Sequence, residues 1–162
     1  MIRHCCKLVE LVVAFSMIAA LGACNKWDDY KANRLVGAVI SGKLAEVKKL
    51  DAAGYDLNAQ DPSHFGWTPL IASIYSEHTN ISFYLIDRGV DISKRDSSGD
   101  TALMQAIHED DQATARKLVQ ARREELKKSE DWRMVRSSIV AAARDNEKKL
   151  DEWYDILDGL LE

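Results

Sequence analysis

The sequence predicts an all-α fold: a solenoid of helix pairs, with short β-hairpin fingers between successive pairs and a helical cap at the carboxy-terminal end. The main observation is an internal repeat, because Gly66-Trp67-Thr68-Pro69-Leu70 recurs 33 residues later as Gly99-Asp100-Thr101-Ala102-Leu103. A period of this length is typical of solenoids. Apolar residues within each unit also recur at helical spacing. The 162 residues include 46% apolar and 30% charged side chains, a balance typical of globular proteins.

Residues 1–23 have the pattern of a secretion signal. A basic amino-terminal region precedes an apolar run from Leu11 to Leu21, which is shorter than the ~20 apolar residues that a spanning helix needs. The run ends in Leu21-Gly22-Ala23-Cys24, and small residues before a cysteine resemble the lipobox of bacterial lipoproteins. The resemblance implies cleavage before Cys24 and acylation of its sulfur and its amino terminus. The alternatives are an ordinary signal peptide, or an uncleaved anchor, in which this cysteine occurs by chance.

Residues 24–30 are then predicted to form a lipidated tether in front of the repeats. Cys5 and Cys6 leave with the signal and acylation caps Cys24, so cysteine catalysis and disulfide bonds are excluded from the mature chain. Six extended residues span at most ~20 Å, which keeps the folded body close to the membrane. Asn25 follows the cysteine, and the sorting rule of such lipoproteins implies the periplasmic face of the outer membrane.

The repeat region is predicted to cover residues 31–128, and it begins with a helix pair that has no finger. Gly42 lies where the turn between these two helices is expected. The apolar face of the pair comprises Leu35, Ala38, Val39, Val47 and Leu50. A unit with one apolar face and one polar face is what the amino-terminal cap of a solenoid requires.

Two full units follow, each expected to be a finger and two antiparallel helices. Thr68 and Thr101 suit helix N-caps because a hydroxyl accepts a hydrogen bond from an orphan backbone N–H. Pro69 suits the first helical position, and Gly89 suits a left-handed C-cap. The 33-residue period and the Thr-Pro-Leu motif resemble the ankyrin repeat. The resemblance implies a protein partner bound through finger tips and the first helix of each unit.

The sequence departs from the ankyrin pattern at the histidine that usually follows Thr-Pro-Leu. Ile71 and Met104 occupy this position, so the hydrogen bonds that this histidine normally makes between fingers are missing. We therefore expect a less rigid stack of fingers. His78 lies where ankyrin units often carry a histidine beside the turn between helices, and we expect it to be structural.

Residues 129–162 are predicted to form a helical capping region. Residues 122–131 carry charges of alternating sign, which favours a helix extension or a solvated linker over an anion site. Apolar residues within 139–143 and 150–157 then predict one more helix pair. This pair is either a degenerate capping repeat or a separate helical hairpin that packs on the last unit.

Three common enzyme motifs are missing from the sequence. A glycine-rich phosphate loop, a G-x-S-x-G elbow and an H-E-x-x-H helix are all missing. His108-Glu109-Asp110-Asp111 does not predict a metal site, because adjacent helical residues point in different directions. A net charge of −4 argues against a nucleic-acid partner. We therefore expect no enzyme activity, no metal and no cofactor.

The predicted partner-binding residues are His64, Phe65, Trp67, Tyr75, Asp100 and His108. A two-residue insertion lengthens the first finger at Pro62-Ser63-His64-Phe65, and Trp67 follows it. Tyr75 and His108 fall at the ends of the first helices, where ankyrin proteins commonly contact ligands. Exposed aromatic side chains with a polar rim are typical interface anchors. The alternative is that Phe65 and Trp67 fold back onto the neighbouring repeat.

A lipoprotein signal combined with ankyrin repeats resembles small immunity lipoproteins paired with phospholipase toxins, which bacteria deliver to one another by machines such as type VI secretion. The resemblance implies a protein, tethered to the membrane, that neutralises a secreted lipase toxin in the bacterial envelope. We expect it to be a monomer. The alternative is an envelope scaffold or chaperone-like protein that supports a periplasmic enzyme. A neighbouring toxin gene favours the first interpretation, and a neighbouring oxidative-stress gene favours the second.

Overall fold

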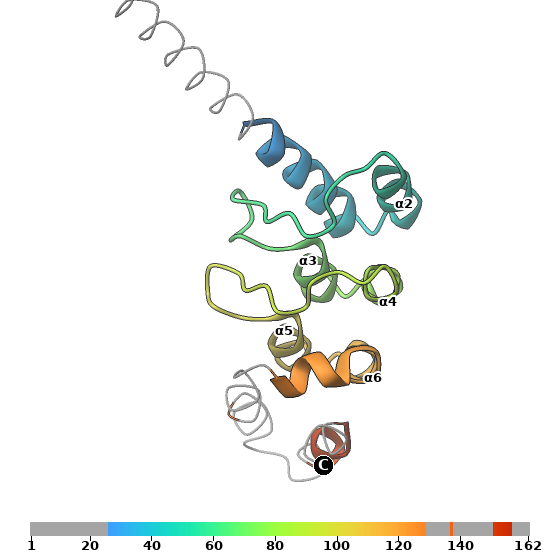
Figure 1. The fold of residues 1–162 in the computed structure, drawn as a ribbon, viewed down its shortest axis with the longest axis vertical. Coiled ribbons are helices and arrows are strands. Elements are labelled where there is room, and N and C mark those ends of the chain that lie inside the picture. Colours follow the sequence, from blue (N-terminus) through green and yellow to red (C-terminus); the bar gives the residue numbers. More distant parts are fainter. Residues whose placement is uncertain (1–25, 129–136, 138–150, 157–162) are drawn as a thin grey trace, which may run out of the picture.

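The computed structural model describes residues 26–128, 137 and 151–156, whose helices stack in one column (Figure 1). The helix over residues 26–40 comes first and carries no label in the figure. It is followed by α2 (Leu44–Ala52), α3 (Pro69–Tyr75), α4 (Thr79–Asp87), α5 (Ala102–His108) and α6 (Gln112–Lys128). Residues 151–156 are helical as well. The arrangement confirms the predicted all-α solenoid.

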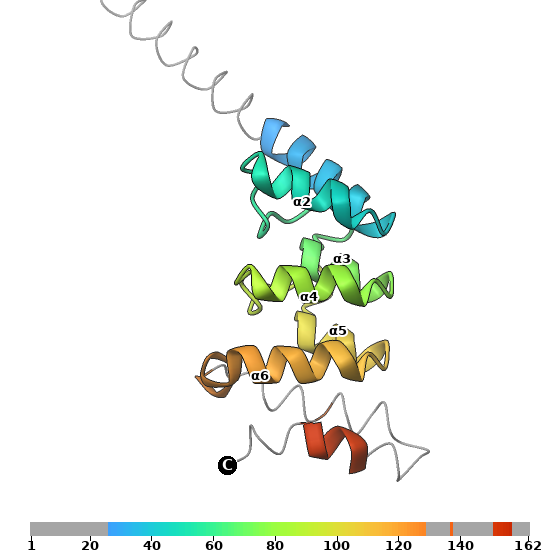
Figure 2. The same cartoon turned by 90° about the vertical axis from the view of Figure 1, so that its right-hand side faces the viewer.

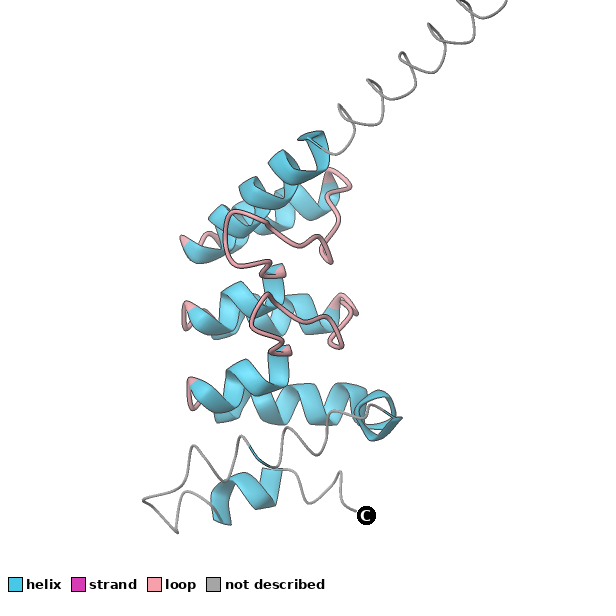
Figure 3. Ribbon diagram, turned by 90° about the vertical axis from the view of Figure 1, so that its left-hand side faces the viewer, coloured by secondary structure: helices cyan, strands magenta, loops and turns pink. Residues whose placement is uncertain are grey.

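The helices form two layers. The helix over residues 26–40, α3 and α5 lie in the inner layer, and α2, α4 and α6 lie in the outer layer (Figures 1 and 2). Two connections project from the inner layer: the first finger (residues 54–67) and the second finger (residues 89–100) (Figure 3). The fingers and the inner helices therefore share one face of the solenoid.

Apolar side chains from both layers form one continuous core. Leu35, Val39 and Val47 of the first helix pair are fully buried in it, as their helical spacing predicts. Ile71 and Met104, which replace the usual histidine, are buried in the same core. An apolar side chain at this position adds buried area, and burial stabilises the fold by roughly 25 cal/mol per Å².

The predicted helix ends are confirmed. Thr68 Oγ1 accepts a hydrogen bond from the Ile71 N–H at 3.2 Å, and Pro69 is the first residue of α3. Thr101 Oγ1 caps α5 in the same way, through the Met104 N–H at 3.4 Å. Gly89 follows Arg88, the C-cap residue of α4. Its φ is +77°, a left-handed conformation that favours glycine.

The fingers are turns rather than hairpins with regular strands. The described part of the chain contains one isolated antiparallel bridge, between Asp61 and Trp67, and no strand. The N–H groups of His64 and Gly66 both donate to the Asp61 carbonyl oxygen, at 3.2 and 3.0 Å. The chain therefore reverses within a few residues and leaves no length for a β-ladder. The predicted hairpin of this finger is thus reduced to a single bridge.

The first helix of the inner layer is already present at Lys26, so residues 26–30 of the predicted tether are helical. Each residue added to an existing helix gains a hydrogen bond at little cost, and the packed side chains of Ala32 and Leu35 hold the following turns in place. The first helix therefore begins five residues before the predicted start of the repeat region at residue 31. The predicted signal at 1–23 and Cys24 lie outside the described residues. Across the described ranges, no helix has both the length and the apolar character needed to cross a bilayer.

Side chains other than the missing histidine join successive repeats. His78 Nε2 lies 3.0 Å from the Ile40 carbonyl oxygen, which confirms its structural role. Gln60 Nε2 donates to the Arg95 carbonyl oxygen at 2.7 Å and so links the first finger to the second. The sequence pattern did not predict this link, because Gln60 lies outside the repeat motif.

Part of the predicted carboxy-terminal cap is visible. Helix α6 extends to Lys128, so residues 122–128 form a helix extension, one of the two alternatives that the charge pattern left open. Residues 151–156 lie beneath α6 in the outer layer (Figures 1 and 2). Trp153 is fully buried there, and its Nε1 donates to Asp110 Oδ1 at 3.3 Å. This contact fits a capping unit; most of residues 129–162 lie outside the described ranges.

A cluster of three polar side chains joins α2 to α4. The Tyr84 hydroxyl donates to the Asp51 carboxylate, and the Arg88 guanidinium contacts the same carboxylate with Nε–Oδ2 2.7 Å and Nη2–Oδ1 3.1 Å. The hydrogen bond from Tyr84, and then that from Arg88, lowers the pKa of Asp51 from its usual 3.8. The folded state therefore favours the ionised carboxylate.

We expect Asp51→Asn to lower the thermal unfolding midpoint by a few degrees at neutral pH. A carboxylate whose pKa is lower in the folded state stabilises the fold above its unfolded pKa and loses this effect as the pH falls. The difference between wild type and Asp51→Asn should therefore shrink as the pH falls below 3.8. Circular dichroism melts of both proteins at several pH values measure this difference in midpoint. Asp87→Asn is the control, because the exposed Asp87 makes a single ion pair with Lys117, and exposed pairs contribute little. An equal midpoint loss at every pH would contradict the account.

Candidate protein-binding surface

The tip of the first finger is organised by a buried carboxylate. Asp61 is fully buried, and its Oδ1 accepts the Ser63 N–H at 2.8 Å. Its Oδ2 lies 2.7 Å from His64 Nδ1 and 3.3 Å from Asn33 Nδ2 of the first helix. Buried carboxylates are costly unless they are hydrogen-bonded, and these partners meet that need. The inserted residues therefore have a defined position on the first helix pair.

The residue at the tip, Phe65, is held in an uncommon backbone conformation. Its φ is +51°, and the following Gly66 has a φ of +67°. Left-handed backbone costs a non-glycine residue roughly 1–2 kcal/mol. The Phe65 carbonyl oxygen accepts the Ser97 N–H of the second finger at 2.8 Å, which stabilises this conformation. The phenyl ring itself is 68% exposed. Strain that is held at an exposed residue is a pointer to function.

Aromatic rings run from this tip to the end of the inner helix α3. The Phe65 and Trp67 ring centroids are 5.8 Å apart, and those of Trp67 and Tyr75 are 4.5 Å apart. The His64 ring stacks on Trp67 at 6.4 Å. Trp67 is half-buried, whereas Tyr75 is 52% exposed. We call Phe65, Trp67 and Tyr75, with His64 at the edge, the aromatic patch.

Phe65 and Trp67 differ in burial, although the sequence left the same two alternatives open for both: exposure at the finger, or folding back onto the neighbouring repeat. Trp67 packs partly against the core, as the alternative of folding back required. Phe65 does not fold back and stays exposed. The partner-binding role of both residues stays a prediction. Sequence reasoning missed Asp61 and Asn33, because their contact joins residues 28 positions apart.

The second repeat has a polar pair at the same two positions. Asp100 and His108 lie 33 residues after Trp67 and Tyr75, and they also meet, with His108 Nδ1 3.7 Å from Asp100 Oδ2. The side chain before the N-cap of the inner helix and the side chain at the end of that helix therefore meet in both repeats, although their chemistry differs. One face therefore offers aromatic rings on the first repeat and a partly exposed carboxylate–imidazole pair on the second.

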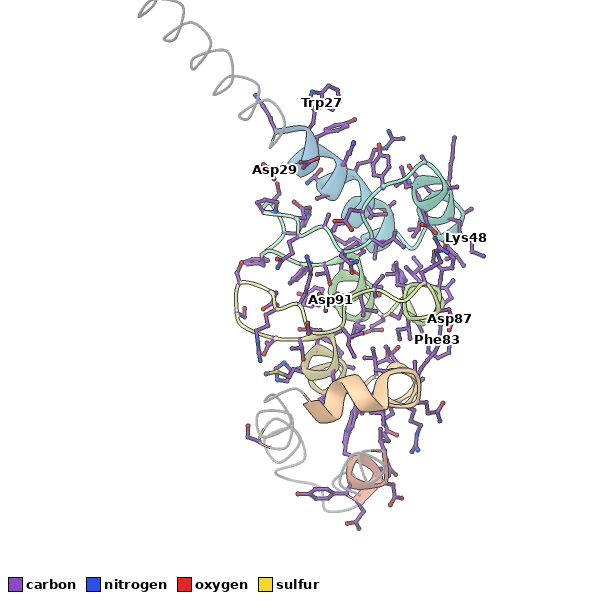
Figure 4. All side chains as sticks on the ribbon, viewed as in Figure 1. Trp27, Asp29, Lys48, Phe83, Asp87 and Asp91 are labelled. Atoms are coloured by element: carbon purple, nitrogen blue, oxygen red, sulfur yellow. The ribbon has the colours of Figure 1, made fainter. Side chains whose placement is uncertain are left out.

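The outer layer does not offer a comparable surface. Phe83 lies on this layer with Lys48 and Asp87, on the side opposite the fingers (Figure 4). Lys117 Nζ covers the Phe83 ring at 4.7 Å from its centroid. Among the residues with described side chains, the exposed large apolar ones are Trp27, Tyr30, Phe65 and Tyr75. Among the described side chains, the exposed aromatic surface is therefore confined to the first finger with α3 and to the start of the first helix.

The polar groups between the first helix and the first finger form no metal centre within the described residues. A pocket of about 440 Å³ lies between the first helix and the first finger, and its lining includes Asp28, Asp29, Lys31 and Asp56. In the part of the chain that the structure describes, no three His, Cys, Asp or Glu side chains are placed to hold a metal ion. The arrangement is suited to contact with another macromolecule through apolar rings and hydrogen bonds.

Comparison with known proteins places the repeats in a family. The sequence profile described as "Ankyrin repeats (3 copies)" matches residues 35–129. The rat (Rattus norvegicus) protein "Ankyrin repeat and SAM domain-containing protein 6" is 37% identical over 71 residues, which are 44% of this chain. Its mouse (Mus musculus) counterpart is 35% identical over the same length. The matched segment spans 8% of the length of each of these relatives.

Proposed function

Because this chain belongs to the ankyrin-repeat family and is a protein-binding module, we propose that it is a membrane-tethered immunity protein that neutralises a phospholipase-type toxin. The single observation that carries the binding role is the aromatic patch on the first finger and α3. Its rings lie on the same face as the inner helices, and no ring of this kind is exposed on the outer layer within the described ranges.

The patch has the chemistry of an interface centre. Aromatic side chains supply much of the binding energy of protein interfaces, and water exclusion around them strengthens neighbouring polar contacts. Asp100 and His108 lie on the next repeat and provide such polar contacts. A net charge of −4 suits a basic toxin, because opposite charges speed the encounter of two proteins.

The envelope location rests on the lipobox-like Leu21-Gly22-Ala23-Cys24. An acyl anchor keeps the inhibitor at the membrane that a phospholipase attacks, which raises its concentration where the toxin acts. One acyl chain gives only reversible binding, whereas several give a stable anchor. We infer from Asn25 that the anchor lies in the outer membrane, with the repeats in the periplasm.

Two modes of inhibition fit a preorganised finger. The tip is held by Asp61 and by the Ser97 N–H, so binding orders little of it. Low ordering cost increases affinity. In the first mode, Phe65 and the inserted residues block the entrance of the toxin's active site. In the second, the same face holds a lid of the toxin closed.

The test is a titration of phospholipid hydrolysis. The purified protein is added to the lipase encoded beside its gene, with vesicles of phosphatidylethanolamine and phosphatidylglycerol as substrate. We expect hydrolysis to fall to the background rate near one equivalent of protein. Undiminished hydrolysis at excess folded protein contradicts the proposal. If the neighbouring gene instead encodes a periplasmic enzyme whose activity rises on addition, the scaffold function takes its place.

A further inference from the structure

A second exposed aromatic pair lies outside the aromatic patch, at the start of the first helix. Trp27 is 65% exposed and Tyr30 is 56% exposed, and their rings meet edge to face with centroids 6.1 Å apart. Figure 4 shows Trp27 at the end of the molecule away from α6. The proposed inhibition of a toxin does not use this pair, so its exposure needs a separate explanation.

The pair shares one helical face with cationic side chains. Residues three, four and seven positions apart lie on the same side of a helix, and this spacing relates Trp27 to Tyr30, Lys31 and Arg34. All four residues are exposed, whereas Ala32 and Leu35 are buried against the core. We call these four residues the basic aromatic face. The carboxylates of the same turn, Asp28 and Asp29, lie at other angles around the helix. They line the pocket beside the first finger together with Lys31, which lies at the edge of the face.

We propose that the basic aromatic face lies against the surface of the lipid bilayer and fixes how the repeats are oriented on the membrane. Tryptophan and tyrosine favour the boundary between headgroups and acyl chains, because each ring has an apolar body and a polar group. Lysine and arginine on the same side are attracted to anionic headgroups. A helix with this combination binds in the plane of the interface.

The short chain between Cys24 and Trp27 makes the lipid bilayer the surface that the basic aromatic face contacts. The inference rests on the proposed acylation of Cys24, which precedes Trp27 by three residues. Three residues span at most ~10 Å. The headgroup region of one leaflet is roughly 5–8 Å thick. With acyl chains on Cys24, the Trp27 ring is therefore held at the depth that tryptophan prefers. The bilayer therefore covers the basic aromatic face, and a partner protein could bind there only by displacing lipid.

The test measures the depth of Trp27 in the lipid-bound protein. The full chain is produced in bacterial membranes, purified, and reconstituted into vesicles of phosphatidylethanolamine, phosphatidylglycerol and phosphatidylcholine brominated in the upper acyl chain. Bromine quenches tryptophan fluorescence at short range. We expect marked quenching in the wild type, loss of most of it in Trp27→Phe, and no loss in the matched variant Trp67→Phe.

The mass of the intact mature protein shows whether it is acylated. It therefore distinguishes failure of the membrane-contact inference from failure of the lipid anchor. An acylated protein whose quenching is the same in wild type and Trp27→Phe overturns the inference and leaves the anchor of the proposed function standing. A protein without acyl chains overturns the anchor, and the inference with it. Trp27 is exposed, so phenylalanine at this position should leave the circular dichroism spectrum unchanged, and the spectrum of each variant is recorded as a check.

Discussion

Replacing Phe65 with alanine is expected to weaken partner binding by about 2 kcal/mol, or about 30-fold in Kd, because interface anchors commonly contribute this much. The thermal unfolding midpoint should not fall, because the ring is 68% exposed and the core loses no packing. Loss of the anchor should appear mainly as faster dissociation. Surface plasmon resonance with the toxin immobilised measures both rate constants.

Trp67→Ala should show the same loss of binding together with a lower midpoint. The indole is half-buried and packs on Tyr75 at 4.5 Å, so its removal also costs folding free energy. Phe83→Ala is the matched control, because this phenylalanine lies on the outer layer beneath Lys117. It should leave the dissociation rate unchanged. Unaltered binding of Phe65→Ala, or a loss as large in Phe83→Ala, would show that the aromatic patch is not the interface.

Replacing Cys24 with serine is expected to abolish fatty-acid labelling and to move the protein from the membrane pellet to the supernatant. The thioether sulfur carries part of the lipid in the proposed anchor, and serine prevents its formation. Metabolic labelling with a tagged fatty acid, followed by fractionation, measures both effects. Cys6→Ser is the matched control, because this residue belongs to the predicted signal and leaves with it. Equal labelling of Cys24→Ser and wild type would rule out the anchor.

Features that depend on neighbouring residues in the sequence could be predicted well. The N-caps at Thr68 and Thr101 and the glycine turn at Gly89 each need one residue type at one position of the repeat. The repeat shows these positions twice, which is why the sequence is sufficient. The buried faces of the helices follow from apolar spacing in the same way.

Features that depend on distant contacts could not be predicted. The left-handed Phe65 depends on the Ser97 N–H of the other finger, and the buried Asp61 depends on Asn33 of the first helix. The helical start at Lys26 was missed for another reason. The apolar spacing of buried residues begins only at Ala32. Before it, Trp27 and Tyr30 are a single pair at helical spacing, which is too short a pattern to predict a helix.

Competition between sibling cells tests the central claim most directly. Cells that lack this gene and the neighbouring toxin gene are mixed with siblings that deliver the toxin. The immunity account predicts that they are killed. A copy of the wild-type gene should rescue them, and a copy carrying Phe65→Ala and Trp67→Ala, present at equal abundance, should not. Unimpaired survival of the deleted cells beside siblings that actively deliver the toxin would contradict the account.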